Sequence, residues 1–304
     1  MYFDLQVNGY AGVDFNADAL SVEDARTVCR ELADHQVAGI LATVITAELD
    51  QMGARLANIA RACEQDELVA KMIRGIHIEG PFINPETGYV GAHPQDAVRG
   101  ADVDSMHRLL DAAAGLTRIV TLAPECDPGG KVTKLLADSG ITVSAGHCNP
   151  SKDELAASID AGLSMFTHLG NGCPLLMHRH DNIIQRALSF SEKLAIGFIA
   201  DGVHVPFNAL RNYLARTGLE RAFIVTDAIA AAGRGPGVFQ LGSQQVVVDE
   251  HLATWSADRQ NLVGSASTMP AVANHLRDEL GLSDSEIRKL TFENPQRAIG
   301  LELT

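Results

Sequence analysis

The residues best able to do chemistry in this chain of 304 amino acids are acidic and imidazole side chains that end short apolar runs. They are Glu79, His147, His168, His204 and Asp227. Two imidazoles and a carboxylate make an open site for a divalent metal ion, and the remaining position takes a water molecule whose pKa the ion lowers toward ~7. A second carboxylate beside the ion can act as the base. This set of residues therefore indicates metal-assisted hydrolysis.

Taken one at a time, these residues have simpler explanations. A histidine at the end of a strand is more often hydrogen-bonded than bound to metal, Glu79 could cap a turn, and Asp227 could cap a helix that begins at Ala228. The shared-site interpretation rests on their positions together, because the active sites of (β/α)8 enzymes lie at the C-terminal ends of the strands. We therefore expect these side chains to converge at one end of a barrel.

Eight apolar runs alternate with amphipathic segments and supply the elements that must position these side chains. Most runs are short and rich in aliphatic or β-branched residues, which is typical of parallel strands covered on both faces. They span residues 2–7, 38–46, 71–78, 117–122, 141–144, 163–167, 194–199 and 222–226. Helix signals lie between them, such as Ser21 at an N-terminus and Gly162 near a C-terminus. The alternation predicts a single closed (β/α)8 barrel of the TIM type, with residues 1–304 as one domain.

Two further features bear on the architecture. An open, doubly wound sheet is the alternative, but residues 5–9 lack the G-x-G-x-x-G turn expected after its first strand. The segment 237–255 breaks the strand–helix rhythm and has the pattern strand, turn, strand, with Gly242 and Ser243 in the turn. We expect it to form a β-hairpin inserted after the eighth strand, above the mouth of the barrel. A helical tail follows over residues 268–301.

Composition limits the partners. The formal net charge is -14 at pH 7 and the sequence pI is about 5.1, which argues against nucleic-acid binding. A phosphorylated small molecule is still compatible with this charge, because one local cationic pocket is enough to bind it. The five cysteines include no C-x-x-C pair, which indicates thiols in a reducing compartment. The sequence has no evident signal peptide or bilayer-spanning run, so we expect a cytoplasmic protein without a membrane partner.

Nine motifs in a fixed order carry a more specific signal. They are DLQVNG at 4–9, HIEGPF at 77–82, GAH at 91–93, SAGH at 144–147, THLGN at 167–171, ADGVH at 200–204, VTDA at 225–228, GSASTM at 264–269 and NPQRAIG at 294–300. Through these motifs nearly the whole chain resembles the N-acetylglucosamine-6-phosphate deacetylase family of the amidohydrolase superfamily. The resemblance implies hydrolysis of the acetamide of N-acetylglucosamine 6-phosphate to glucosamine 6-phosphate and acetate.

The resemblance also assigns the central residues. It implies one divalent ion per chain, with Zn²⁺ preferred and Fe²⁺, Co²⁺ or Mn²⁺ compatible with the same ligand types. Glu79, His147 and His168 would hold the ion. Asp227 would take a proton from the attacking water and later pass one to the leaving amine. His204 would help to polarise the acetyl carbonyl and orient the sugar.

A further set of positions matches family residues that contact the sugar or its phosphate. These positions are Ala92, His93, Asn171, Gly172, Arg179, Leu262, Val263 and Gly264. Arg179 matches the phosphate-binding arginine, which in related dimers reaches across from the neighbouring subunit, so a homodimer is expected. The chemistry agrees, because the arginine fork suits a phosphate dianion and an acidic protein needs such a local cation.

Three departures from the pattern affect these expectations. Superfamily members often carry His-x-His on the first strand, but this chain has the neutral amides Gln6 and Asn8, which are poor ligands. We interpret them as a vestigial second-metal position and expect a one-metal site. Relatives usually have additional residues at both ends that form a small β-sandwich, so a barrel-only short form is expected. Gly170 and Gly172 stand where relatives often carry larger side chains, which leaves the identity of the sugar open.

Other functions remain as alternatives. The chain could be an amidohydrolase that acts on another N-acyl amino sugar, such as N-acetylgalactosamine 6-phosphate, or on a cyclic amide. A cyclic amide would leave Arg179 without a phosphate to bind. A non-enzymatic sugar-phosphate sensor would keep His93 and Arg179, but it would not need Asp227 together with all the metal ligands.

Overall fold

The computed structural model describes residues 1–301, and its central feature is a parallel eight-stranded sheet with the order β1-β4-β5-β6-β7-β8-β9-β10. Its strands are β1 (Tyr2–Val7), β4 (Val37–Ile45), β5 (Ile73–Glu79), β6 (Thr117–Leu122), β7 (Thr142–Ala145), β8 (Leu163–Phe166), β9 (Ala195–Ile199) and β10 (Ala222–Val225). Each strand falls on one of the predicted apolar runs. The agreement follows from burial on both faces, which makes such strands continuous apolar stretches.

The sheet closes into a barrel where the end of β1 meets the segment that follows β10. Val7 forms a parallel bridge with Ala228, and the carbonyl oxygen of Ala228 accepts from the amides of Asn8 at 2.7 Å and Gly9 at 3.1 Å. A short antiparallel pair, β2 (Gly9–Tyr10) and β3 (Val13–Asp14), follows this contact. The predicted (β/α)8 barrel is therefore confirmed.

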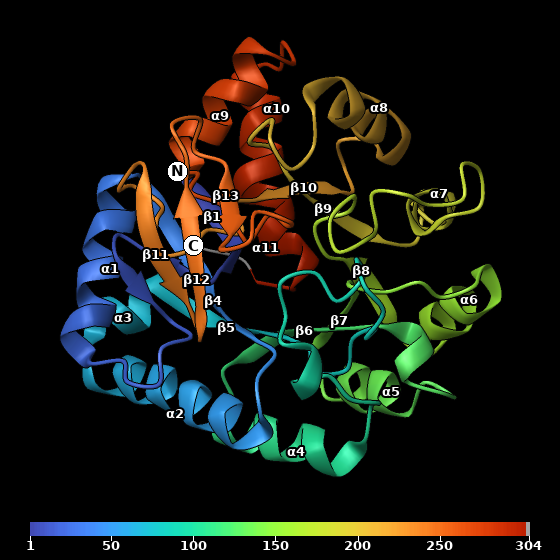
Figure 1. Ribbon diagram of the computed structural model, residues 1–304, viewed down its shortest axis with the longest axis horizontal. Helices are drawn as coiled ribbons and strands as arrows, with labels where there is room; N and C mark the ends of the chain where they lie inside the picture. The colour runs from blue at the N-terminus through green and yellow to red at the C-terminus, as the bar shows by residue number, and fades with distance from the viewer. Residues whose placement is uncertain (302–304) are drawn as a thin grey trace.

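Helices surround the strands, as Figure 1 shows. Those between strands are α1 (Val22–Asp34), α2 (Leu49–Gln65), α3 (Glu67–Met72), α4 (Val103–Ala112), α5 (Lys131–Asp138), α6 (Lys152–Asp160), α7 (Ile183–Ser189) and α8 (Phe207–Thr217), with the 3-10 turns η1 (Gln95–Ala97) and η2 (Pro124–Cys126). Ser21 caps α1 as predicted, because its Oγ accepts from the amide of Asp24 at 3.0 Å. The tail contains α9 (Met269–Asp278), α10 (Asp284–Arg288), the π-helical η3 (Lys289–Glu293) and α11 (Asn294–Ala298). None of the described helices has the length and apolar character needed to cross a bilayer.

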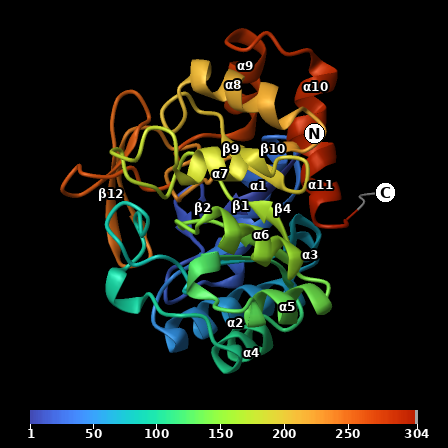
Figure 2. The same cartoon turned by 90° about the vertical axis from the view of Figure 1, so that its right-hand side faces the viewer.

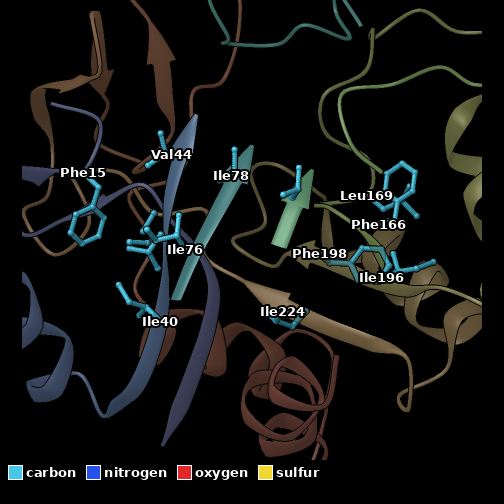
Figure 3. Close-up of a cluster of buried hydrophobic side chains, with 14 of the residues drawn as sticks. Phe15, Ile40, Val44, Ile76, Ile78, Phe166, Leu169, Ile196, Phe198 and Ile224 are labelled. Carbon is cyan, nitrogen blue, oxygen red and sulfur yellow. The ribbon is translucent and has the colours of Figure 1, made fainter. Parts of the chain in front are cut away.

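Two layers of apolar side chains hold the barrel in shape. Ile40, Ile76 and Phe198 belong to a large cluster between the strands and the helices, shown in Figure 3. A second cluster contains Phe3 of β1 together with Phe292 from η3. Burial of each such side chain contributes about 1.5–3 kcal/mol to folding. The apolar packing leaves the C-terminal ends of the strands for polar groups.

The segment expected to form a hairpin lies beside the barrel mouth. β11 (Gly237–Leu241) pairs antiparallel with β12 (Gln244–Val248), and a third strand, β13 (Thr254–Ser256), extends the sheet by one strand beyond the expected hairpin. Leu241 and Val246 pack in one cluster with Ile45 and Ile229. Figure 2 shows β12 on the same side of the molecule as the loops that follow β5 and β8.

We expect opposite effects from adding a methyl group at two glycines. A Cβ at Gly9 would lie 2.5 Å from the carbonyl oxygen of Val13 and 2.9 Å from the amide nitrogen of Ala230, so Gly9→Ala should lower the free energy of unfolding by about 1–3 kcal/mol. Gly53 lies within α2, and its Cβ would meet only Ala112 at 3.8 Å, so Gly53→Ala should raise that free energy by about 0.5–1 kcal/mol. Denaturant unfolding of both variants tests this, and equal effects would contradict the close approach at Gly9.

Candidate active site

Three of the side chains predicted from the sequence meet at the C-terminal ends of their strands. Glu79 is the last residue of β5, and His147 and His168 follow the ends of β7 and β8. The Oε1 atom of Glu79 lies 3.0 Å from Nε2 of His168 and 3.5 Å from Nε2 of His147. One ligand atom from each residue lies within 4.8 Å of the other two, and all three residues are buried.

This cluster fits a divalent metal ion. Bonds of about 2.1 Å in a tetrahedral arrangement put neighbouring ligand atoms about 3.4 Å apart. The separations from the Glu79 oxygen to the two imidazole nitrogens are close to that value. One carboxylate and two imidazoles are also a donor set that leaves a coordination position for water or substrate. Glu79, His147 and His168 could therefore hold one ion.

The surroundings of Glu79 favour its ionised form. Burial by itself raises the pKa of Glu79, but hydrogen bonds from His147 and His168 and their charges outweigh burial and hold this pKa well below its usual range. Burial lowers the pKa of His168, and its contact with Glu79 outweighs that effect and raises it. Nε2 of Gln6 donates to both oxygens of Glu79, at 3.1 and 3.2 Å. Gln6 therefore acts as a hydrogen-bond donor to a ligand at the position interpreted as a vestigial metal site.

Three residues of the site share an unusual backbone conformation. The φ angles of His147, His168 and Asp227 are 51°, 31° and 52°. Residues with a Cβ rarely adopt this left-handed region, and they keep it only where their surroundings hold it. The carbonyl oxygen of His147 accepts from the amide of Asn84 at 2.9 Å, and that of His168 accepts from the amide of Asn171 at 3.0 Å. A contact from the loop after β5 thus stabilises the turn at His147, and a local hydrogen bond stabilises the turn at His168.

The ring of His147 is fixed from two directions. Its Nδ1 lies 2.9 Å from the carbonyl oxygen of Tyr89, and because a carbonyl can only accept, Nδ1 carries the proton and Nε2 is left for a metal. The loop after β8 packs on the other side, where a Cβ at Gly172 would lie 2.8 Å from Nδ1 at a φ of +59°. Glycine at position 172 therefore allows close packing against the ring.

Asp227 follows β10 and faces the same space. Desolvation raises the pKa of Asp227 to about 6, and the charge of Glu79 adds to the rise. Nδ2 of Asn8 donates to Oδ1 of Asp227 at 2.7 Å, which fixes the orientation of the carboxylate. A carboxyl with a pKa near 6 is suited to exchanging a proton close to neutral pH.

His204 is oriented by a neighbouring carboxylate. Oδ1 of Asp201 accepts from the amides of Val203 at 2.9 Å and His204 at 2.8 Å, and Oδ2 lies 2.6 Å from Nδ1 of His204. Burial by itself raises the pKa of Asp201, but the hydrogen bond and charge of the His204 ring, together with the two backbone amides, outweigh burial and lower this pKa. The arrangement leaves Nε2 of His204 for a ligand, so Asp201 orients the histidine.

His93 approaches from the loop after β5. Its Nδ1 lies 2.8 Å from Oγ1 of Thr46, and the centre of its ring lies 4.3 Å from that of His147. Burial lowers the pKa of His93 to about 3, and the nearby His147 lowers it further. The ring is therefore neutral at physiological pH, with Nε2 left to contact a ligand.

A cavity of about 490 Å³ lies beside the cluster and has the size of a small-molecule site. Most of the residues expected at the site line it. They are Asn8, Glu79, Ala92, His93, His147, His168, Asn171, Gly172, His204, Asp227, Leu262 and Gly264.

Three expected residues do not line this cavity. Gln6 donates to Glu79, as described above, and Val263 is only 1% exposed. Arg179 is exposed in the loop after β8. Its neighbour Asp181 pairs with Arg186 at 2.6 Å, so that acid does not neutralise Arg179. Within one chain, the structure does not bring Arg179 to the metal cluster.

Other cavity residues were missed at the level of sequence. Leu241, Trp255, Gln260 and Asn261 line the cavity from the segment that contains β11 to β13. Trp255 is the single tryptophan of the chain and lies in the one segment that breaks the strand–helix rhythm. That coincidence was the available signal, but spacing along the chain does not reveal the distance between this segment and the metal-binding cluster.

Comparison with known proteins agrees with this geometry. N-acetylglucosamine-6-phosphate deacetylase from Bacillus subtilis (strain 168) is 32% identical over 301 residues, which are 98% of this chain and 74% of that protein. The chain belongs to the N-acetylglucosamine-6-phosphate deacetylase family. As a member of this family it is a hydrolase of amide bonds.

Two further similarities refine the comparison within the deacetylase family. N-acetylgalactosamine-6-phosphate deacetylase from Shewanella sp. (strain ANA-3) is 31% identical, over 98% of this chain and 73% of that protein. The solved structure of a variant N-acetyl-D-glucosamine-6-phosphate deacetylase from Mycobacterium smegmatis, in complex with N-acetyl-D-glucosamine-6-phosphate, has a TM-score of 0.89 and 29% identity. That alignment covers 99% of this chain and 77% of the other. No protein-family model matches the chain.

Proposed function

We propose that this protein hydrolyses the acetamide of N-acetylglucosamine 6-phosphate, giving glucosamine 6-phosphate and acetate. The observation that carries the proposal is the buried cluster of Glu79, His147 and His168, which shares one cavity with Asp227 and His204. One divalent ion per chain fits this donor set, with Zn²⁺ as the first choice and Fe²⁺, Co²⁺ or Mn²⁺ as alternatives. The relatives described above support a sugar phosphate as the substrate.

The cavity residues can share the steps of the hydrolysis. A divalent ion at the cluster would polarise the acetyl carbonyl and make water more acidic. Asp227 takes a proton from the water as its oxygen attacks the carbonyl carbon. The C–N bond then breaks as Asp227 returns the proton to the amine nitrogen. His204, in its doubly protonated form, donates from Nδ1 to Asp201 and from Nε2 to the carbonyl oxygen of the acetyl group.

The remaining cavity walls hold the sugar in our proposal. His93 and Asn171 offer side-chain hydrogen bonds, and Ala92 and Gly172 offer backbone groups in the cavity wall. The segment 262–264 closes the cavity from the side of β13, with Leu262 and Gly264 on its wall. These contacts set the acetyl group against the metal cluster.

Arg179 supplies the cation for the phosphate in our proposal. Leu175 and Leu176, in the same loop, are 99% and 94% exposed. Neighbouring apolar side chains that protrude fully into water are typical of a protein contact surface. They support a homodimer in which this loop packs against a second copy of the chain, and in which Arg179 reaches the phosphate bound to the partner subunit through charge-assisted hydrogen bonds.

The galacto epimer, N-acetylgalactosamine 6-phosphate, is the second candidate substrate. The relative from Shewanella sp., which is 31% identical, carries that name. Gly170 and Gly172, the two glycines that leave the identity of the sugar open, both line the cavity. A cyclic amide is less well supported, because it would leave Arg179 without a phosphate to bind.

A substrate panel tests the assignment directly. Protein reconstituted with Zn²⁺ should release acetate from N-acetylglucosamine 6-phosphate with a kcat/KM about 10- to 100-fold higher than from the unphosphorylated sugar, because phosphate contacts contribute about 1.5–3 kcal/mol. The galacto epimer and its unphosphorylated form complete the panel. Elemental analysis of the same preparation should return one metal per chain. Equal rates on all the sugars, or two metals per chain, would contradict the proposal.

Asp227→Asn should bind metal normally and lose nearly all turnover. A carboxamide cannot accept the proton of the attacking water, and general-base assistance contributes on the order of 10² to 10⁴ in rate. Metal content and acetate release should be measured on one preparation of the variant. Full metal occupancy with near-normal activity would show that Asp227 is not the base.

Arg179→Ala should weaken the use of the phosphorylated sugar by about one to two decades in kcat/KM and leave slow turnover of the unphosphorylated sugar unchanged. If Arg179 contributes only to binding, KM rises alone, and if it also positions the acetyl group, kcat falls as well. The matched control is Arg221→Ala, because Arg221 is also an exposed arginine but lies just before β10, at the N-terminal end of that strand. Fluorescence of Trp255, which lines the cavity, reports sugar binding independently of turnover. An equal, weak effect on both sugars would remove Arg179 from the phosphate site.

A further inference from the structure

A carboxylate outside the cavity joins the loops that carry the metal cluster. Glu125 lies in η2, directly after β6. Its Oε1 accepts from Nδ2 of Asn84 at 2.9 Å and from the amide of Asn149. Its other oxygen, Oε2, is buried without a hydrogen-bond partner among the described residues. A single oxygen atom therefore links the loops that follow β5, β6 and β7.

Both donors to Glu125 are connected to His147, one by a hydrogen bond and the other through the backbone. The amide of Asn84 donates to the carbonyl oxygen of His147 at 2.9 Å, and Asn149 lies two residues after His147. The loop that contains Asn84 also contains Tyr89, whose carbonyl oxygen accepts from Nδ1 of His147 at 2.9 Å. The backbone and the ring of His147 are thus both held by segments that Glu125 ties together.

His147 needs such support because its backbone is strained. Its φ of 51° lies in the left-handed region, which a residue with a Cβ keeps only where its surroundings hold it there. A shift of the loop toward a relaxed conformation would move Nε2 away from the Oε1 atom of Glu79. The hydrogen bonds through Asn84 and Asn149 oppose that shift.

We propose that Glu125 is a positioning residue that holds His147 in the geometry required for metal binding, acting through Asn84 and Asn149. This inference rests on the proposed metal site at Glu79, His147 and His168. Glu125 acts as a hydrogen-bond acceptor, because only Oε1 has partners. A neutral amide oxygen at the same place can accept the same two bonds, so the charge of Glu125 is dispensable.

Zn²⁺ affinity of the folded, metal-free protein tests the proposal. Competition with a chromophoric chelator should show a dissociation constant about 10- to 100-fold higher for Glu125→Ala than for the unaltered protein, the usual effect of losing a group that orients a metal ligand. Glu125→Gln should stay within about threefold of the unaltered protein, because it keeps the acceptor. Both measurements use Zn²⁺ alone and need no turnover.

Asp127→Ala is the matched control. Asp127 is a buried carboxylate on the same loop, and it accepts from the amides of Val132 at 3.1 Å and Thr133 at 2.8 Å, so its bonds run to α5 and away from His147. This variant should lose stability in denaturant unfolding but keep its Zn²⁺ affinity. If Glu125→Ala fails to fold, Asn84→Asp is the second variant. It removes the Nδ2 donor to Glu125 but keeps the oxygen that accepts from the amide of Glu86. This variant should raise the Zn²⁺ dissociation constant in the same way.

The outcomes separate this inference from the proposed function. If the unaltered protein binds no Zn²⁺, the metal-site proposal fails and this inference fails with it. If the unaltered protein binds Zn²⁺ and Glu125→Ala or Asn84→Asp binds it equally well, only the positioning role is overturned. A Glu125→Gln variant as weak as Glu125→Ala would overturn the hydrogen-bond mechanism, and a loss of affinity in Asp127→Ala would reduce the effect to general destabilisation of the loop.

Discussion

A carboxylate with 2% exposure has lost almost all of its water, and Glu79 at the end of β5 is such a group. Leaving a buried carboxylate ionised and unpaired costs several kcal/mol, so the surrounding structure must compensate it. His147, His168 and Gln6 all contact its oxygens. These contacts favour the ionised form, which is the form that binds a metal ion. The rest of the site is arranged around this buried negative charge.

The barrel brings the groups that compensate the charge of Glu79 together at the ends of its strands. All the strands of the barrel present their C-terminal ends on the same side, so polar side chains from distant parts of the sequence can meet there. Three of the residues at those ends, His147, His168 and Asp227, have positive φ angles. Such turns persist only where their surroundings hold them. Asn84, from the loop after β5, supports the carbonyl of His147, and Asn171, in the same turn, supports the carbonyl of His168.

The same buried charge affects its neighbours differently according to their distance and hydrogen bonds. It raises the pKa of His168, which hydrogen-bonds to it, and it helps to raise the pKa of Asp227 to about 6. At His93, burial and the neighbouring His147 outweigh the same charge and lower the pKa to about 3. One cavity thus contains a carboxylate that could hold a metal ion, a carboxyl suited to proton transfer and a neutral imidazole, a combination suited to amide hydrolysis.

The sequence by itself determined the strands and the residues at their ends, because a strand buried on both faces must be a short apolar run and its last residues can be counted directly. It therefore predicted the barrel and placed Glu79, His147 and His168 near one another. Only the tertiary structure decided that Trp255 lines the cavity and that Glu125 bonds to Asn84 and Asn149, since these contacts join segments far apart in the chain. It also left Arg179 exposed and away from the cavity of its own chain. Local periodicity reports which face of an element is buried, but the distance between two loops depends on how the whole barrel closes.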